Sequence, residues 1–275
     1  MKNIIITGGT GGIGRHIVKA LSKIYQITVV GRNQNIFENL QFDQKNVKFY
    51  KLDISSVSQI KLFYDHFSKH NNSLYGLINI AGIQSPIGKF IDNKRSDWDM
   101  NLQINLFGTI NMIRFALQIL KNEKYGKIIN FSGGGATSER ANFSAYSISK
   151  IGIVKMTEIL ASELKEDAID VNAVAPGAVN TDMLDEILNA KDDVTVDEYK
   201  SALNRKKNGG ESPSQITKLC QFLLSPSSNG ISGKLLSASW DPWGSEIFQK
   251  KLKNEKDFAM LRRIDDRNFY KLIKD

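Results

Sequence analysis

The amino-acid sequence predicts an α/β protein, built on a single doubly wound parallel sheet of about seven strands with helices on both faces. Three observations predict this fold class. Short continuous apolar runs alternate with longer segments of helical periodicity over most of the chain. The runs stop at Gly, Asn or Asp, as buried parallel strands do. A glycine cluster directly follows the first run and opens an amphipathic segment. A chain of 275 residues can bury one such core.

The apolar runs are the expected strands, and they lie at residues 3–7, 26–30, 47–52, 74–80, 127–131, 169–175 and 234–238. The expected helices lie between them at about residues 13–24, 56–70, 96–121, 143–164 and 213–224. Strand and helix alternate, so the crossovers should be right-handed and should place helices on both faces of the sheet.

Two segments fall outside this alternation. Residues 182–212 have the pattern of polar helices after a strand's carboxyl end, and they are too long for a tight connection. Such an insertion predicts a lid over a cleft. Residues 239–275 begin with Trp-Asp-Pro-Trp and continue as a mixed-charge, helical tail. The tail either covers the site, packs on a partner subunit or forms a solvated appendage. The expected organisation is therefore a nucleotide-binding domain at 1–238 and an extension at 239–275.

Composition limits the function classes. The 37 Lys and Arg residues exceed the 29 acidic ones, but they are spread along the chain, which indicates a solvated basic surface and no nucleic-acid partner. The lone cysteine, Cys220, excludes an intrachain disulfide and is expected in the core of a helix. The first strand begins at Asn3 without a leader, and no apolar run approaches the ~20 residues of a membrane span. We expect a cytoplasmic protein without a membrane partner.

The glycine cluster predicts a dinucleotide site. The sequence T-G-G-T-G-G-I-G at 7–14 places Gly8, Gly12 and Gly14 between a strand and a helix, with Thr10 and Ile13 in the same loop. Glycines permit a tight turn and let backbone N–H groups at the helix N-terminus approach a pyrophosphate. No G-K-[ST] sequence follows, which excludes a nucleoside triphosphatase loop. A glycine cluster alone is often only a turn, but between a strand and a helix it predicts dinucleotide binding.

The ends of the later strands refine this prediction. The second strand ends at Gly31 and Arg32 where an acidic residue would favour NAD, and Arg32 can pair with a 2′-phosphate. NADP(H) is therefore favoured, and NAD(H) stays open. Asp53, followed by Ile54, is placed to accept from the adenine amino group, and Ala81 and Gly82 bring backbone close to the ribose. Three histidines show no ligand spacing, so no metal is expected.

Tyr146 and Lys150 are spaced to lie on one face of a helix. A cation near a phenol favours the phenolate and should lower the tyrosine pKa, so that Tyr146 can exchange a proton with a carbinol. The pair alone also fits a solvated helix face. Combined with the dinucleotide site, it predicts a nicotinamide enzyme.

These motifs together resemble the short-chain dehydrogenase/reductase family from about Lys2 to Ala238, which has a Rossmann-like fold. The resemblance rests on the glycine loop, Asp53, the N-I-A-G sequence at 79–82, Asn105 in I-N-L-F-G, the Tyr146/Lys150 pair and P-G-A-V-N-T at 176–181. It implies that Asn105 completes a proton relay and that the last loop holds the nicotinamide carboxamide through Pro176, Gly177, Val179 and Thr181. It also implies a homodimer or homotetramer through the helices at 96–121 and 143–164.

The sequence departs from the family pattern at two positions. Ile80 replaces a second Asn, and Gly133 stands where the family carries a serine that steadies the substrate carbonyl. Ser132 lies one residue earlier and can substitute only if the glycine-rich loop shifts, because consecutive residues leaving a strand point in opposite directions. A substrate hydroxyl, Thr137, Ser144 or a backbone N–H are the alternatives. Losing such a donor typically costs 10²–10³ in rate.

The expected function is an NADP(H)-dependent oxidoreductase that transfers hydride between nicotinamide and a small carbonyl or secondary alcohol. Tyr146, Lys150, Asn105 and Ser132 are the expected catalytic residues. The S-G-G-G sequence at 132–135 and the W-D-P-W sequence at 240–243 resemble a subgroup from bacterial surface-carbohydrate biosynthesis, which implies a keto-sugar or nucleotide-sugar substrate. The alternatives are an NAD-dependent alcohol dehydrogenase and a silent dinucleotide-binding sensor or scaffold. The intact Asn105, Tyr146 and Lys150 set speaks against the silent protein.

Overall fold

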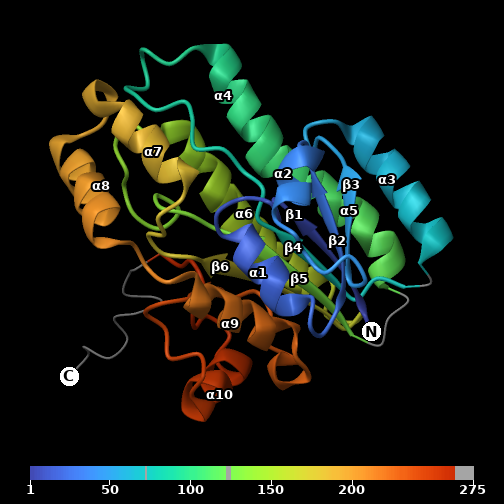
Figure 1. The fold of residues 1–275 in the computed structure, drawn as a ribbon. Coiled ribbons are helices and arrows are strands. Elements are labelled where there is room, and N and C mark those ends of the chain that lie inside the picture. The colour runs from blue at the N-terminus through green and yellow to red at the C-terminus, as the bar shows by residue number, and fades with distance from the viewer. Residues whose placement is uncertain (72, 122–124, 264–275) are drawn as a thin grey trace, which may run out of the picture.

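A computed structural model of the chain describes residues 1–71, 73–121 and 125–263. Within them, seven parallel strands form one sheet in the order β3-β2-β1-β4-β5-β6-β7, with helices on both sides (Figure 1). This confirms the predicted fold class. The strands are β1 Asn3–Thr7, β2 Gln26–Gly31, β3 Val47–Lys51, β4 Gly76–Asn79, β5 Gly126–Phe131, β6 Ile169–Ala175 and β7 Leu235–Ser237.

Two apolar clusters hold the helices to the two faces of the sheet. On one face, α1 (Gly14–Leu21) and α9 (Pro213–Leu224) pack against β1, β2 and β5. On the other face, α3 (Val57–His70) and α5 (Thr109–Leu120) pack against the same sheet, beside α6 (Ser144–Glu163). The strands are buried on both faces, which is why each appears in the sequence as a continuous apolar run and not as an alternating one.

The order of the strands reverses beside β1. This strand pairs with β2 on one side and with β4 on the other, with Thr7 opposite Val30 and Asn79. The loops that leave β1 and β4 therefore diverge to opposite faces, and a crevice opens at the carboxyl ends of the strands. Open α/β sheets bind their ligands at this point.

The helix expected over residues 96–121 is not continuous. The structure divides it into α4 (Arg95–Leu102), the π-helical turn η1 (Gln103–Gly108) and α5. A π turn inserts an extra residue into the helical register, so it changes which side chains face the sheet. Here it directs Asn105 at the backbone of Ile83, while Gly108 packs so close to Ile54 that a Cβ would lie 2.9 Å from the Ile54 carbonyl oxygen.

A short helix, α2 (Gln34–Asn39), follows β2 and was absent from the predicted elements. It has no buried residue and so lacks the apolar stripe by which a helix is recognised in a sequence. Its N-terminus is set by Asn33, whose side chain accepts a hydrogen bond from the Ile36 N–H at 3.2 Å.

The expected lid, residues 182–212, contains α7 (Asp182–Asn189), the 3₁₀ turn η2 (Lys191–Asp193) and α8 (Val196–Asn208). Both helices lie beyond the carboxyl edge of the sheet and contact each other (Figure 1). A separate apolar cluster joins them to the start of α6, with members Phe143, Tyr146, Leu184, Ile187, Val194 and Ala202. The lid is therefore packed directly over the tyrosine of the predicted catalytic pair.

The described part of the tail packs on α9. The Trp243 ring stacks on Phe222 with centroids 6.1 Å apart, and α10 (Glu246–Asn254) follows. Lys234, just before β7 and after the 3₁₀ turn η3 (Pro226–Ser228), donates to the carbonyls of Glu255 and Phe258 at 2.9 Å. The last part of the tail, residues 264–275, lies outside the described residues.

Cys220 lies in α9 inside the first apolar cluster, as the sequence predicts. Its side chain is completely buried, and burial raises the pKa of the thiol far above its usual range. Among the described residues, none of the helices combines the length and apolar character that crossing a membrane requires.

Candidate active site

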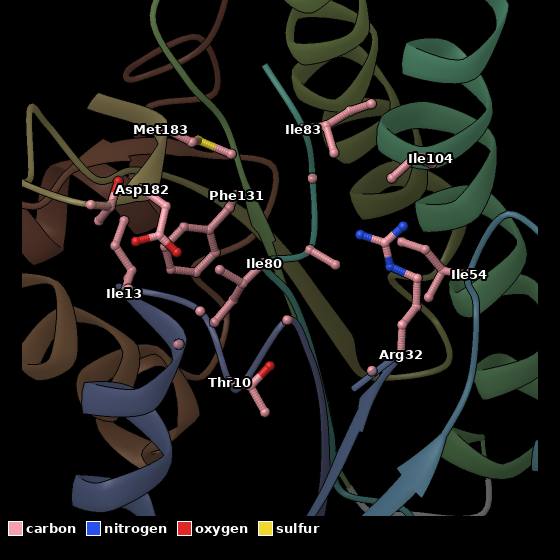
Figure 2. A pocket seen from close by; sticks show the side chains of 18 of the residues that line it. Thr10, Ile13, Arg32, Ile54, Ile80, Ile83, Ile104, Phe131, Asp182 and Met183 are labelled. Carbon is pink, nitrogen blue, oxygen red and sulfur yellow. The ribbon is translucent and has the colours of Figure 1, made fainter. Parts of the chain in front are cut away.

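A cleft of about 400 Å³ lies at the carboxyl ends of the strands, where the strand order reverses. Figure 2 shows Ile13, Asp182 and Met183 along one side of the cleft, Arg32 and Ile54 on the opposite side, and Thr10 of the glycine turn between them. Of the residues predicted to bind coenzyme or to act in catalysis, the structure brings these to the cleft wall: Gly8, Thr10, Gly12, Ile13, Gly14, Arg32, Asp53, Ile54, Ala81, Gly82, Ser132, Tyr146, Lys150, Pro176 and Thr181.

At Gly8, Gly12 and Gly14 the turn after β1 is packed so closely that a side chain has no room. A Cβ on Gly8, which has a φ of +67°, would lie 2.7 Å from the Ala81 nitrogen, and one on Gly12 would lie 2.5 Å from the Thr181 methyl. A Cβ on Gly14 would overlap the Gly8 carbonyl oxygen. The turn therefore presents backbone to the cleft directly before the N-terminus of α1. This arrangement fits the pyrophosphate of a dinucleotide.

The ends of β2 and β3 form the other half of the cleft. Arg32 is exposed and extends over the cleft beside Ile54 (Figure 2). Asp53 follows β3, and its Oδ1 accepts hydrogen bonds from the Ser55 N–H at 2.9 Å and the Ser55 hydroxyl at 2.8 Å. These bonds fix the carboxylate at the strand end. In the described structure, β2 and the residue after it bring one charged side chain to the cleft wall, and this is the Arg32 cation.

Thr7 holds the loop after β4, and Asn79 at the end of β4 connects this strand through Asn130 to α6. The Thr7 hydroxyl accepts from the N–H groups of Ile80 at 3.1 Å and Ala81 at 3.2 Å, although Thr7 itself is buried. Asn79 donates to Asn130 of β5 at 2.9 Å, and Asn130 donates to Thr157 of α6 at 3.0 Å. This buried polar chain runs across two strands to the helix of the catalytic pair, so it sets the position of α6 behind the cleft.

Asn105 lies in the π turn and is completely buried, behind the cleft wall. Its side chain accepts from the Ile83 N–H and donates to the Ile83 carbonyl, both at 2.8 Å. It also lies 3.1 Å from the Ser149 hydroxyl, which donates to the Tyr146 carbonyl at 2.7 Å. The side-chain amide is therefore occupied by protein groups that connect the loop after β4 with the first turns of α6. The predicted relay through Asn105 stays a prediction.

Tyr146 and Lys150 lie on one face of α6 and line the cleft, with 6% and 4% of their surfaces exposed. The Lys150 ammonium donates to the Phe131 carbonyl at the end of β5 at 3.0 Å, and it lies 5.6 Å from the centre of the Tyr146 ring. Burial lowers the pKa of Lys150 to about 8. The helix thus delivers both groups to the cleft wall.

The pKa of Tyr146 differs from the sequence expectation. Burial raises it above the usual value, the Arg140 charge acts to lower it, and Glu186 acts to raise it. From the sequence, we expected the Lys150 charge to have the dominant influence on the pKa of Tyr146. In the structure that ammonium is directed to the Phe131 carbonyl, and loss of hydration of the phenolate outweighs the nearby charges.

The departure at Gly133 has a steric basis. The Tyr146 hydroxyl lies directly against this glycine, where a Cβ would overlap the hydroxyl oxygen and lie 2.8 Å from Cζ. Ser132 is 4% exposed and lines the cleft, with its N–H bonded to the Val174 carbonyl at 2.9 Å. The loop after β5 therefore gives the position at 133 to the tyrosine and brings Ser132 to the wall.

Two residues of the loop after β6 that were predicted to bind coenzyme, Gly177 and Val179, do not reach the cleft wall. Gly177 has a φ of +77° and lies against the Glu211 carboxylate, and a Cβ on Gly210 would lie 3.1 Å from the Val179 carbonyl carbon. The Glu211 N–H also donates to Ala178 at 3.0 Å, and Ser239 donates to the Glu211 carboxylate. The end of the lid and the start of the tail thus cover this side of the loop, while Pro176 and Thr181 face the cleft.

Sequence reasoning missed several residues of the cleft wall, among them Ile83, Ile104, Phe131, Asp182, Met183 and Glu186. A signal existed for the last three. They begin α7 directly after Thr181, and residues 182 and 186 are four apart on one helical face. The described residues contain no group of three or more His, Cys, Asp and Glu side chains that could hold a metal ion.

Comparison with known proteins is consistent with this geometry. Residues 2–192 match the family described as short chain dehydrogenase. A 3-oxoacyl-(acyl-carrier-protein) reductase of Buchnera aphidicola is 30% identical over 239 residues, which cover 86% of this chain and 94% of the reductase. A D-beta-hydroxybutyrate dehydrogenase of Cupriavidus necator is 28% identical, covering 90% and 98%. Among solved structures, ElxO with NADP bound matches with a TM-score of 0.75 at 26% identity, covering 86% and 96%.

Proposed function

This chain belongs to the short-chain dehydrogenase family and is an NAD(P)-dependent oxidoreductase, and we propose that it uses NADP(H) to interconvert a small ketone and a secondary alcohol. The observation that carries the proposal is that Tyr146 and Lys150 line the same cleft as the close-packed glycine turn after β1. The proposal does not include the direction of the reaction, because reduction of the ketone and oxidation of the alcohol use the same atoms.

Arg32 supports the choice of NADP(H). Its guanidinium is exposed over the adenosine half of the cleft, and β2 ends without a carboxylate that would repel a 2′-phosphate. The ElxO structure with NADP bound supports the same choice. Titration of the protein with NADPH and with NADH measures the preference, and tighter binding of NADH would contradict the role of Arg32.

NADP(H) held by the glycine turn, Arg32 and Lys150 would supply hydride to the carbonyl carbon. Tyr146 donates a proton to the carbonyl oxygen as negative charge develops on it. Lys150 holds a positive charge in the buried wall beside the phenol and binds ribose hydroxyls. Asn105 holds the Ile83 backbone and the first turns of α6 in position, and the proton relay through it that the family resemblance implies is part of the proposal. Ser132 donates a hydrogen bond to the carbonyl oxygen in place of a side chain at 133.

The experiment is the substitution Tyr146→Phe, which removes the phenolic hydroxyl and keeps the ring in its apolar cluster. We expect turnover of a panel of ketones and keto-sugar nucleotides to fall at least ~10²-fold. NADPH binding should stay nearly unchanged, since the substitution leaves the glycine turn and Arg32 intact. NADPH consumption and NADPH fluorescence titration measure the two quantities.

The alternative is a dinucleotide-binding protein without catalysis. It would give no NADPH consumption in the wild-type protein with any compound of the panel, although the coenzyme binds. Equal turnover by the wild-type and the Tyr146→Phe protein would instead place the proton donor elsewhere in the cleft.

Several finer predictions are part of the proposal. The keto-sugar or nucleotide-sugar substrate rests on the loop after β5 and the tail sequence. A homodimer or homotetramer is supported by apolar side chains exposed on η1 and α6, among them Phe107, Ile148 and Ile151. The cytoplasmic location and the division into a domain at 1–238 and an extension at 239–275 stay predictions as well.

A further inference from the structure

Arg140 lies in the loop between β5 and α6, outside the motifs that the sequence analysis singled out. Its guanidinium carbon is 3.7 Å from the centre of the Phe143 ring and 6.0 Å from the centre of the Tyr146 ring. Only 15% of its side chain is exposed. A cation over an aromatic face is attracted by the ring quadrupole, so the Phe143 ring holds the guanidinium beside the catalytic tyrosine.

The same guanidinium binds the lid. Its Nη2 is 2.7 Å and its Nε 3.4 Å from the two carboxylate oxygens of Glu198 in α8. Two-point contact of this kind fixes orientation as well as distance. Glu198 is itself fixed at the start of α8, because its N–H donates to the Thr195 hydroxyl at 3.2 Å.

A third contact extends the network to α7. Arg140 Nη1 lies 3.4 Å from the Gln84 side-chain oxygen, and the Gln84 amide donates to the Met183 carbonyl at 3.3 Å. Gln84 is buried, and Met183 lines the cleft. One side chain therefore connects the loop after β5, the loop after β4 and both lid helices, and it reaches Met183 of the cleft wall through Gln84.

We propose that Arg140 is a positioning residue that fixes the lid over the cleft and places a second positive charge beside Tyr146. This inference rests on the proposed function, because it concerns the proton donor of that reaction. In a purely structural role, the hydrogen bonds of Arg140 to the lid would be sufficient. In the proposed role its positive charge is required as well, because the charge acts on the Tyr146 phenol.

The charges around Tyr146 come from every element packed against it. They are Lys150 of α6, Arg140 of the loop after β5, Asp182 and Glu186 of α7, Glu198 of α8 through its ion pair with Arg140, and Arg205 of α8 through its ion pair with Glu198. Removing the Arg140 charge should raise the tyrosine pKa. Removing the Glu198 charge should lower it, because Arg140 then lies beside the phenol without its counter-charge.

Three variants separate the two roles. Arg140→Gln removes the charge, Glu198→Gln breaks the ion pair and keeps the Arg140 charge, and Arg140→Lys restores a charge without the two-point contact. The readout is the titration of the Tyr146 phenol by ultraviolet absorbance in protein saturated with NADP⁺, each variant measured against the same variant carrying Tyr146→Phe. The Arg140 charge, 6.0 Å from the centre of the ring, acts to lower this pKa.

We expect Arg140→Gln to raise the titration midpoint, Glu198→Gln to lower it and Arg140→Lys to lie close to the wild type. The control is Arg205→Gln, which removes a lid cation 3.7 Å from the same Glu198 carboxylate but without the contact to the Tyr146 ring. It should leave the midpoint nearly unchanged. Limited proteolysis of residues 190–210 should be faster in both Arg140→Gln and Glu198→Gln.

Shifts of Arg140→Gln and Glu198→Gln in the same direction, or no shift in either, would overturn the proposal. A merely structural tie predicts one of those results, since both variants break the same contact. If Arg140→Gln does not fold, the Glu198→Gln and Arg140→Lys midpoints still decide between the two. The proposed function fails independently, if the wild-type protein binds NADPH but consumes none with any compound of the panel, because the phenol titration does not depend on turnover.

Discussion

At Gly133 the backbone lies directly beneath the hydroxyl of Tyr146. The tyrosine fills the space into which a side chain at this position would project. A serine at this position and the observed tyrosine rotamer exclude each other, so the glycine is part of the site geometry and not simply a lost hydrogen-bond donor. The Tyr146 position and the residue at 133 have to be considered together.

We predict that Gly133→Ala displaces the Tyr146 hydroxyl by about 1 Å and lowers kcat on the order of 10²-fold. Gly133→Ser should not restore a better enzyme, because its Cβ meets the same overlap. Steady-state kinetics with saturating NADPH measure the effect. The matched control is Gly134→Ala, whose nearest neighbour would be the Arg140 side chain at 3.5 Å. Wild-type kcat in Gly133→Ala would show that the hydroxyl lies elsewhere during turnover.

Lys150 carries a stability cost that depends on pH. Burial lowers its pKa from 10.5 to about 8 in the folded protein. Between these two values the unfolded chain binds more protons, so the free energy of unfolding rises with pH in that window. Below about pH 8 the full cost of burying the ammonium is present.

We therefore predict that Lys150→Met stabilises the coenzyme-free protein at pH 7 by about 1–3 kcal/mol, offset in part by the lost hydrogen bond to Phe131, and abolishes turnover. Urea unfolding at a series of pH values provides the measurement. The gain should shrink as the pH approaches 10.5. A gain independent of pH would mean that the lysine is not buried in its charged form.

The loop after β6 is held in place by two segments that are distant from it in the sequence, the end of the lid and the start of the tail. Glu211 at the end of the lid covers Gly177 and accepts from Ser239 of the tail. We predict that Glu211→Ala releases the loop and weakens NADPH binding about tenfold, or about 1.4 kcal/mol. Fluorescence titration with NADPH tests this. Glu246→Ala, an exposed residue in the first turn of α10, is the control. Equal affinity in both variants would contradict the prediction.

At the scale of elements, the sequence predicted all seven strands to within two residues at each end, because strands buried on both faces are short apolar runs bounded by polar residues or glycines. The break in the helix at 96–121 was not predicted. The π turn at Asn105 depends on the Ile83 backbone and on the close approach of Gly108 to Ile54, and these contacts join distant parts of the chain. Helical periodicity reports a buried face and carries no information on such contacts.

For the whole molecule, the two edges of the sheet carry different tasks. The cleft occupies the carboxyl edge, and a buried ion pair lies at the other edge. Lys127 near the start of β5 is 1% exposed and donates to Asp170 of β6 at 2.7 Å. Asp170 also accepts from the Gly230 N–H at 3.2 Å, so the pair joins the two strands to the turn before β7.

We predict that Asp170→Asn lowers the free energy of unfolding by about 3–5 kcal/mol, because it leaves the Lys127 charge buried without its partner. NADPH affinity of the folded fraction should not change. Asp167→Asn breaks the more exposed pair with Lys121 and should cost less than about 1 kcal/mol. Denaturant unfolding of both variants measures the difference. Similar losses for the two would mean that the buried pair adds nothing beyond a surface contact.

The cleft was predictable from the sequence at this scale, since glycines and polar residues at the ends of parallel strands must meet at one edge. The lid contacts were not. Arg140 and Glu198 are 58 residues apart, in a loop and in a helix without a shared motif. Their pairing depends on how α7 and α8 fold back over α6, which the apolar cluster at Phe143 and Tyr146 determines.

The position of Cys220 has a consequence for handling the protein. Because the sulfur is buried in α9 and burial raises the pKa of the thiol, we expect the native protein to react only slowly with alkylating reagents and not to form disulfide-linked dimers in air. The rate of Cys220 labelling should therefore report how often the face covered by α1 and α9 opens, without an engineered probe.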